Sequence, residues 1–479
     1  MGDAISLLLA FLVGSLGLVA VSALMTRRPK AADSGIPFIS SWVPYFGASW
    51  HFRRGRIAAL LAWTREYGPV FSFTMLGQPV TCVTDASLFG PVIKSAALIL
   101  QPLKTKILNR VFGASNPIDS LALASLAALT RKNVLVQLSG TSLSQWSTKS
   151  HQLFRAKVAA CLEQDASTQV EVYPWLAHHV FTTMMETFYG PELASAQFEA
   201  DLDALDSAFT ALYMGIPAKW KKVDAPRNRL LLALEDYVTK NIDQVSPLAR
   251  DRWQGCQEHD LPPRDQAAHQ LNMIWAMTFN TVRTAFWLLY YLQHTPNAWT
   301  AVASEIREHV NPEEWSTVSL QVQLQRCPLL DSAVKETLRL TMSSGFMRVA
   351  VDAAAMELGN GITLKVQPGD QVVLQAGVPF HDPKQCPDPS EFHVDRFMHM
   401  SPDLAKDFRP FGLGKFQCPG QFFATEVVKM SLATLVLETE ISQFQGTVGA
   451  DYSSPGSFAV KDIHAVRMNI RRSLSAVVA

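Results

Sequence analysis

The chain has 479 residues, of which 48% are hydrophobic, and its 42 Lys and Arg residues equal its 42 Asp and Glu residues. The length allows a large buried core, and the balanced charge removes any bulk electrostatic reason to expect a nucleic-acid partner. No internal repeat, low-complexity tract or Gly/Ser linker follows the first fifty residues, so we expect one large catalytic domain over 51–479. The six cysteines have no regular spacing, which suits a reducing cytosol better than a disulfide framework.

The first expected element is a transmembrane helix over 5–25. This stretch carries no charge, and at about 1.5 Å per residue it spans the roughly 30 Å hydrocarbon core of a bilayer. The basic residues Arg27, Arg28 and Lys30 follow it, with none before it, which favours an uncleaved anchor over a cleaved signal peptide. They also keep the following domain on the cytosolic side. The basic, Pro-containing segment 26–50 is then a hinge that cannot continue the anchor helix.

A long buried helix is expected over 270–292, because this stretch is apolar almost all the way round. Within it, Asn280 and Thr281 are the polar residues of interest. One interpretation is that they bond back to helix carbonyls and bend the helix. The other is that they face a reacting group, and the two can hold together.

Apolar spacing predicts another helix over 329–340, in which Glu336 and Arg339 lie three residues apart on one face and can pair. Taken alone, such a pair is an ordinary surface ion pair. Beyond this helix, Arg348 and the valines at 349, 366, 372 and 373 belong to short strands joined by turns. The sequence therefore predicts a mainly α fold with small β-sheets.

Near the C-terminus, a single cysteine stands in the glycine-punctuated segment Phe411-Gly-Leu-Gly-Lys-Phe-Gln-Cys418-Pro-Gly420. Gly412, Gly414 and Gly420 can take backbone angles that residues with a Cβ resist. We expect the chain to fold tightly under a flat cofactor there and to aim amide N–H groups at the sulfur.

An apolar run after Gly420 predicts a helix, with Pro419 at its first position, where no hydrogen bond is lost. This places Cys418 at a helix N-terminus, where the dipole and the unpaired N–H groups favour an anionic sulfur. A thiolate is the axial ligand that pushes electron density onto haem iron. The alternative is a buried free cysteine that packs as a small hydrophobe.

The same segment resembles the haem-binding loop of the cytochrome P-450 family, through Phe411, Gly414, Cys418 and Gly420. Phe416 departs from the family pattern, because it stands where the family usually has Arg or His to hold a haem propionate. The resemblance implies the cytochrome P-450 fold, with haem b (iron protoporphyrin IX) as cofactor and Cys418 as the ligand of its iron.

Further roles follow from this resemblance. Glu336 and Arg339 match a family helix that is locked to a later arginine, here Arg396, and this network would shape the loop beneath the haem without reacting. Arg348 lies where the family runs a strand past the haem edge, which implies a propionate contact. The alternative for it is a solvated strand arginine.

Most of the family has an acid and then Thr where this chain has Phe279 and Asn280. Asn280 can hydrogen-bond dioxygen but is no acid, whereas Thr281, or water that it orders, can relay protons. Aromatic residues at helical spacing are more often plain core than pocket lining. The residues implied to line a substrate pocket are Trp275, Ala276, Phe279, Phe346, Phe458 and Val460.

The Asn280-Thr281 pair, the lost basic residue at 416 and the Cys418-Pro-Gly-Gln ending are similar to one branch of the family, which holds cholesterol 7α-hydroxylase, sterol 12α-hydroxylase and prostacyclin synthase. The similarity is tight only from about 270 to 430. It implies a single-pass enzyme of the endoplasmic reticulum membrane that uses O2 to oxidise a bulky apolar steroid or terpenoid, including in secondary metabolite biosynthesis.

Electrons would come from NADPH through a separate reductase, because this chain carries no glycine fingerprint for a flavin or a nicotinamide. Lys415 and Lys429 would help to dock the reductase, or are simply solvated charges. Two other functions stay open at this stage. One is an oxygen-independent isomerase that acts on a peroxide, and the other is a haem-binding protein without turnover.

Overall fold

The structure is a computed structural model that describes residues 35–43, 46–75, 77–115, 120–162, 168–315, 318–341, 345–414, 417–451 and 459–473. The expected membrane anchor at 5–25 and the first part of the hinge lie outside these residues. No helix within the described ranges is long and apolar enough to cross a membrane. The chain is mainly helical with small sheets, as predicted.

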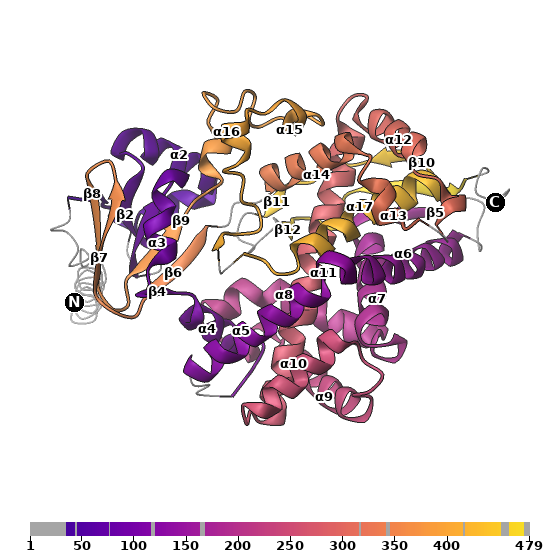
Figure 1. The fold of residues 1–479 in the computed structure, drawn as a ribbon, viewed down its shortest axis with the longest axis horizontal. Coiled ribbons are helices and arrows are strands. Elements are labelled where there is room, and N and C mark those ends of the chain that lie inside the picture. The colour runs from indigo at the N-terminus through magenta and orange to yellow at the C-terminus, as the bar shows by residue number, and fades with distance from the viewer. Residues whose placement is uncertain are drawn as a thin grey trace, which may run out of the picture. The chain divides into compact units, whose positions relative to one another are not determined.

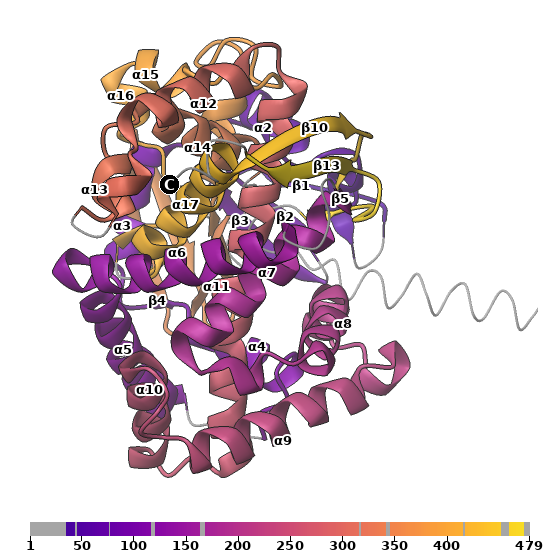
Figure 2. The ribbon, with the colours of Figure 1, turned by 90° about the vertical axis from the view of Figure 1, so that its right-hand side faces the viewer.

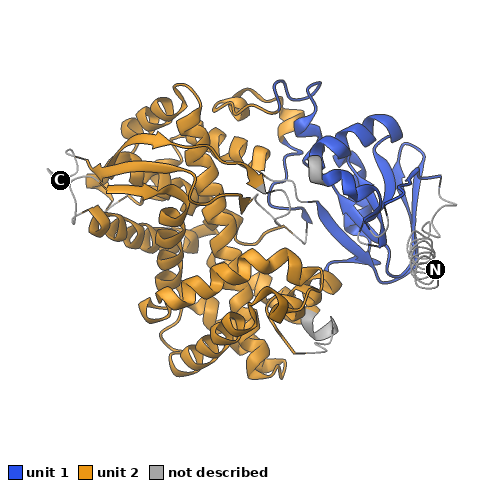
Figure 3. Ribbon diagram, turned by 180° about the vertical axis from the view of Figure 1, so that it is seen from behind, with its two compact units in different colours: residues 1–100, 343–389, 406–416 blue, residues 101–342, 390–405, 417–479 orange. Residues whose placement is uncertain are grey.

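Two compact units make up the chain (Figure 3). Unit 1 comprises residues 1–100, 343–389 and 406–416, and unit 2 comprises residues 101–342, 390–405 and 417–479. The chain therefore leaves unit 2 after the helix at 329–340 and returns to it twice before its end.

Unit 1 is built on a six-stranded sheet with the strand order β1-β2-β3-β9-β6-β4, accompanied by a separate β7-β8 hairpin. Its strands are β1 (Phe38–Ile39), β2 (Val70–Met75), β3 (Gln78–Val83), β4 (Leu98–Ile99), β6 (Phe346–Ala350), β7 (Ala354–Gly359), β8 (Ile362–Val366) and β9 (Gln371–Leu374). Its helices are α2 (Arg56–Tyr67) and α3 (Phe89–Lys94), with 3₁₀ turns η2 (Gly47–Arg54), η3 (Ala86–Leu88) and η7 (Val378–His381). The short strands predicted around the valines at 349, 366, 372 and 373 are confirmed as β6, β8 and β9.

Both faces of this sheet are covered. Phe71 and Phe73 of β2 pack with Trp63 of α2 in one apolar cluster, whereas Val70 belongs to another cluster that contains Phe89 of α3. Because neighbouring residues of a strand point to opposite faces, a continuous apolar run is what a strand covered on both faces needs.

Unit 2 holds most of the described helices (Figures 1 and 2). They are α4 (Gln101–Arg110), α5 (Ser120–Gln137), α6 (Gly140–Leu162), α7 (Val172–Phe188), α8 (Ala196–Tyr213), α9 (Asp224–Lys240), α10 (Pro247–Glu258), α11 (Pro263–His294), α12 (Ala298–His309), α13 (Leu320–Leu324), α14 (Pro328–Thr341), α15 (Arg396–His399), α16 (Pro402–Ala405) and α17 (Gln421–Glu438). Short 3₁₀ turns stand at η4 (Pro191–Leu193), η5 (Ala218–Lys221) and η6 (Pro312–Glu314).

Two small sheets complete unit 2, with the orders β10-β13-β5 and β11-β12. Their strands are β5 (Thr168–Glu171), β10 (Thr439–Gln445), β11 (Ala450–Asp451), β12 (Ala459–Val460) and β13 (Arg467–Arg472). The helix predicted over 270–292 is confirmed inside α11, which packs against α7, α9, α10, α14 and α17. The helix predicted over 329–340 is confirmed as α14.

Candidate active site

Cys418 stands directly before α17, but the helix begins later than the sequence predicted. Gly420 is the N-cap of α17 and Gln421 its first residue, so Pro419 lies outside the helix. The N–H of Gln421 donates to the carbonyl of Cys418 at 3.4 Å, which makes 418–421 a turn with proline second. A turn favours proline there because the ring fixes φ near the required value. Gly420 has an ordinary φ of −93°, so its expected special angle is wrong.

The thiol of Cys418 is solvent-exposed, unlike those of Cys82, Cys256, Cys327 and Cys386, which are buried. Surrounding protein atoms nevertheless raise the pKa of Cys418 by desolvation, while the backbone N–H of Gly420 and the charge of Arg131 act to lower it. Both opposing groups favour the thiolate.

Arg131 was not recognised from the sequence. It lies on α5, and its Nη1 donates to the carbonyl of Gln417, the residue before Cys418. This contact joins positions 286 residues apart in the chain, and the motif around the cysteine gives no signal for it.

The start of the cysteine loop belongs to unit 1. Gly412 and Gly414 have φ values of 92° and 62°, as the sequence predicted, and a Cβ on Gly414 would stand 2.9 Å from Cγ2 of Ile93. The close approach and the left-handed φ both require glycine at 414. Phe411 is half-buried, and the Lys415 and Phe416 predictions lie outside the described residues.

An open strip interrupts the burial of α11 within unit 2. Most of this helix is buried, yet Ala276 is exposed and Met277 and Asn280 are half-buried. Residues three or four apart share one face of a helix, so Asn280 lies on one face with Met277 and with Ala276. An exposed Ala between buried turns leaves room for a flat apolar group, and Phe422 of α17 is likewise 50% exposed. The small side chain and the accessible thiol in the same unit fit a haem.

Asn280 and Thr281 behave differently from one another. The hydroxyl of Thr281 is buried and donates to the carbonyl of Met277 at 2.8 Å, and Thr284 donates in the same way to Asn280. Thr281 thus makes the backward bond to the helix that was one of its two interpretations. Asn280 lies on the open strip.

Glu336, Arg339 and Arg396 come together in unit 2. Arg339 donates from Nε and Nη2 to the two carboxylate oxygens of Glu336 at 2.7 and 2.9 Å, and Arg396 donates from Nε to Oε1 at 2.8 Å. The side chains of Glu336 and Arg339 are fully buried. The backbone N–H of His393 adds a fourth donor at 3.1 Å. The pair is therefore a buried network and not the surface ion pair that spacing alone allowed.

Arg348 lies on β6 of unit 1 and is 2% exposed, so it is not a solvated strand arginine. Desolvation lowers its pKa to about 10, and its Nη1 donates to the carbonyl of Met347 at 2.8 Å. Phe346, on the same strand, packs against the apolar cluster of unit 1 that contains Val70. The propionate contact of Arg348 stays a prediction.

The remaining expected pocket residues fall in unit 2. Trp275 and Phe279 are buried on α11, and Val460 is buried on β12, whereas Phe458 lies outside the described residues. Lys429 is not a solvated charge, because its Nζ pairs with Asp331 at 2.8 Å and its side chain is only 10% exposed.

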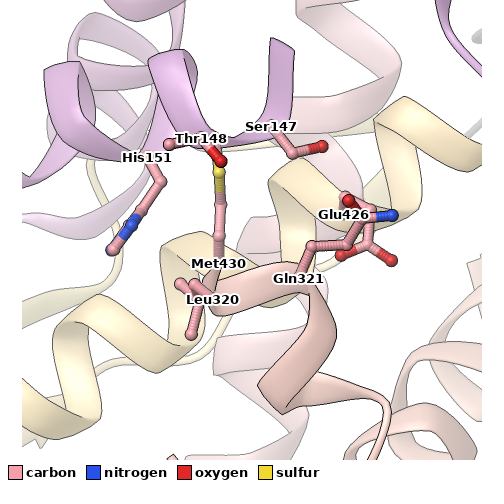
Figure 4. A pocket seen from close by; sticks show the side chains of 7 residues that line it. All are labelled: Ser147, Thr148, His151, Leu320, Gln321, Glu426 and Met430. Carbon is pink, nitrogen blue, oxygen red and sulfur yellow. The ribbon is translucent and has the colours of Figure 1, made fainter. Parts of the chain in front are cut away.

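A separate small cavity lies between α6, α13 and α17 in unit 2 (Figure 4). Its lining residues are Ser147, Thr148, His151, Leu320, Gln321, Glu426 and Met430. The centre of a water-sized sphere can occupy ≈ 10 Å³ of it, which is room for one water molecule and far too little for a porphyrin.

Two titrating side chains of this cavity, His151 and Glu426, have pKa values that are shifted in opposite directions. Burial, and then the charge of Arg155, lowers the pKa of His151 to about 4, whereas burial raises the pKa of Glu426 to about 7. As the pH falls from 7 to 5, His151 becomes protonated in the unfolded chain but stays neutral in the folded protein. Its contribution to the free energy of unfolding therefore falls. The folded Glu426 gains a proton before the unfolded one does, so its contribution rises over the same range.

We expect single substitutions to expose these opposite slopes. The free energy of unfolding of His151→Gln, relative to wild type, should rise by about 1 to 2 kcal/mol between pH 7.5 and pH 5, and that of Glu426→Gln should fall by a similar amount. Urea unfolding at both pH values measures this. Parallel pH profiles for wild type and both variants would contradict the two shifts.

Comparison with known proteins gives consistent matches. The family profile of Cytochrome P450 matches residues 37–460. "7-alpha-hydroxycholest-4-en-3-one 12-alpha-hydroxylase" of Homo sapiens is 25% identical over 98% of both chains. "Cytochrome P450 7B1" of Mus musculus is 23% identical over 90% of this chain and 89% of the mouse protein. "Cholesterol 7-alpha-monooxygenase" of Cricetulus griseus is 24% identical over 88% and 89%, respectively.

Proposed function

The chain belongs to the cytochrome P450 family and is a haem-dependent monooxygenase, and from this premise we propose that it oxidises a bulky, apolar molecule of the steroid or terpenoid class. Similarity to a 7-alpha-hydroxycholest-4-en-3-one 12-alpha-hydroxylase and to a cholesterol 7-alpha-monooxygenase along most of the chain supports this substrate class. So does the buried aromatic cluster that Phe112, Phe209 and Trp275 form in unit 2.

The observation that carries the proposal is the setting of Cys418. Cys418 is exposed and precedes α17; desolvation raises its pKa, and the Gly420 N–H and the Arg131 guanidinium oppose that rise by favouring the anion. Cys418 would hold the haem iron through its thiolate, with the N–H of Gly420 and the cation of Arg131 steadying the sulfur. The bound haem supplies the reductive activation of dioxygen, which no side chain of this protein can perform.

The other residues of the site bind and position. Ala276 leaves the surface of α11 open, while Asn280 offers an amide that donates and accepts hydrogen bonds beside it. Asn280 is no acid, so protons would reach the reacting oxygen through water ordered by this amide. Arg348 is proposed to neutralise a haem propionate, because Phe416 provides no charge for it.

Anchoring by 5–25 in the endoplasmic reticulum membrane and a separate NADPH-dependent reductase complete the proposal. An apolar substrate would then enter from the bilayer, and the cytosolic face would be accessible to the reductase.

A product screen tests this function. The purified haem-loaded protein is incubated with a panel of sterols and terpenoids, O2, NADPH and a microsomal reductase, and the products are analysed by mass spectrometry. A substrate whose mass rises by one oxygen only when both reductase and NADPH are present is the expected result. Turnover of a lipid hydroperoxide without NADPH, and of no panel member with it, would indicate the isomerase instead.

A further inference from the structure

We propose that Arg283 of α11 is a specificity-determining residue, which binds a neutral oxygen acceptor of the substrate, a ketone or a hydroxyl. This inference rests on the proposed function and names a polar group that its apolar substrate must carry. It starts from a buried guanidinium among aromatic side chains.

Arg283 is held in place by a short network between α8 and α11 of unit 2. Its Nη2 donates to Oδ2 of Asp206 at 2.5 Å, and Oδ1 of Asp206 accepts a hydrogen bond from Nε1 of Trp275 at 2.8 Å. The side chain of Arg283 is 4% exposed and that of Asp206 is 11% exposed. Both carboxylate oxygens are thus engaged, and the guanidinium has a fixed position.

Aromatic rings surround this pair. The guanidinium carbon of Arg283 lies 5.6 Å from the ring centre of Phe279. Trp275 stacks on Phe209 with their ring centres 4.4 Å apart, and it packs edge-on against Phe112 with their ring centres 6.0 Å apart. Trp275 and Phe279 are two of the α11 residues expected to contact substrate, and Arg283 lies against Phe279 and shares Asp206 with Trp275.

The hydrogen bond to Asp206 uses only Nη2 of the Arg283 guanidinium. Among the described residues, neither Nε nor Nη1 of Arg283 has an acceptor in hydrogen-bond geometry, although both atoms are buried; the guanidinium also interacts with the hydroxyl of Tyr173. Leaving a buried donor unsatisfied costs about 1 to 3 kcal/mol, more for a charged group. Buried polar groups in proteins almost always have a partner, and an oxygen acceptor of a bound substrate would provide one for these N–H groups.

Charge decides which acceptor fits. Asp206 already neutralises Arg283, and the neighbouring Tyr173 is protonated, because burial raises its pKa to about 12. A carboxylate added to this neutral set would leave one buried negative charge uncompensated, which is strongly unfavourable. A ketone or hydroxyl oxygen accepts the same hydrogen bonds without adding charge.

Equilibrium dialysis tests the proposal without relying on turnover. The ligands are 5α-androstane, its 3-ketone, its 17-ketone and its 3-carboxylic acid, measured against the haem-loaded full chain. We expect at least one ketone to bind wild type about tenfold or more tightly than the hydrocarbon, and the acid to bind more weakly than that ketone. Equal affinity for the hydrocarbon and both ketones would overturn the proposal.

The variant Arg283→Met with Asp206→Asn removes the donors while it keeps the site neutral. Asn at 206 still offers an oxygen to Trp275, so this variant avoids an unpaired buried charge and should fold. Its preference for the ketone should disappear while its affinity for the hydrocarbon stays within about threefold. A ketone preference retained in this variant would assign the selectivity elsewhere.

A matched pair on the same helix α8 provides the control. Asp201 accepts two hydrogen bonds from Arg229 of α9 and one from Gln197, but the side chain of Arg229 is 51% exposed. Arg229→Met with Asp201→Asn should leave the ketone preference unchanged. The carbon-monoxide spectrum of each preparation distinguishes failure of the Arg283 proposal from failure of the proposed function. If wild type shows a normal thiolate band but no preference for the ketone, only the role of Arg283 is contradicted. If the thiolate band is absent, the proposed function is contradicted.

Discussion

Replacing Cys418 with Ala is expected to abolish the red-shifted carbon-monoxide band of the reduced protein. A thiolate ligand would push electron density onto the haem iron and so produce that band, and Cys418 is the exposed cysteine in the described part of the chain. Reduced carbon-monoxide difference spectra of wild type and variant measure the effect, and haem content is read on the same samples.

Two further variants make this result specific. Cys161→Ala removes a half-exposed thiol from α6 and should leave the band in place. Cys418→His offers an imidazole at the same position and should shift the band to the wavelength of nitrogen-ligated haem. A red-shifted band that persists in Cys418→Ala would show that another residue holds the iron.

The cysteine loop and the helices could be predicted because their signals are local. A long, almost wholly apolar stretch identified α11 and apolar spacing identified α14, and the glycines at 412 and 414 have the left-handed φ values expected of them. The sequence predicted the start of α17 two residues too early, because proline is favoured both in the first turn of a helix and at the second position of a preceding turn. Sequence spacing alone does not separate these two positions.

Contacts between distant segments could not be predicted in this way. Arg131 meets Gln417 across 286 residues, and Arg283 meets Asp206 across 77. Neither Arg131 nor Arg283 has an oppositely charged residue three or four positions away on its own helix, so the helix pattern gives no sign of its role. Their partners are fixed by packing between helices.

Glu336 is the other residue whose replacement should strongly affect stability and haem retention. It binds Arg396 and so holds the segment 390–405 in unit 2. The segment 390–405 lies in unit 2 between two stretches of unit 1. Arg396 binds the Glu336 carboxylate, and Arg339 and Arg396 both donate to the carbonyl of Glu391 at 3.2 Å. This network holds 390–405 on α14, shortly before the loop that leads to Cys418.

We expect Glu336→Gln to lower the free energy of unfolding by about 3 to 5 kcal/mol and to yield protein that retains little haem. The substitution leaves two guanidinium groups buried without a counter-charge, and removing one partner of a buried ion network typically has an effect of this size. Urea unfolding and the ratio of haem to protein absorbance measure the two effects.

Lys335→Ala on the same helix is the control, since Lys335 pairs with Asp331 but its side chain is 46% exposed. Such a pair contributes about 0 to 1 kcal/mol, so stability and haem content should be nearly unchanged. If Glu336→Gln matched Lys335→Ala in both measurements, the network would be dispensable for the fold and for cofactor retention. The contrast therefore tests whether burial, and not the mere presence of opposite charges, makes this ion network essential.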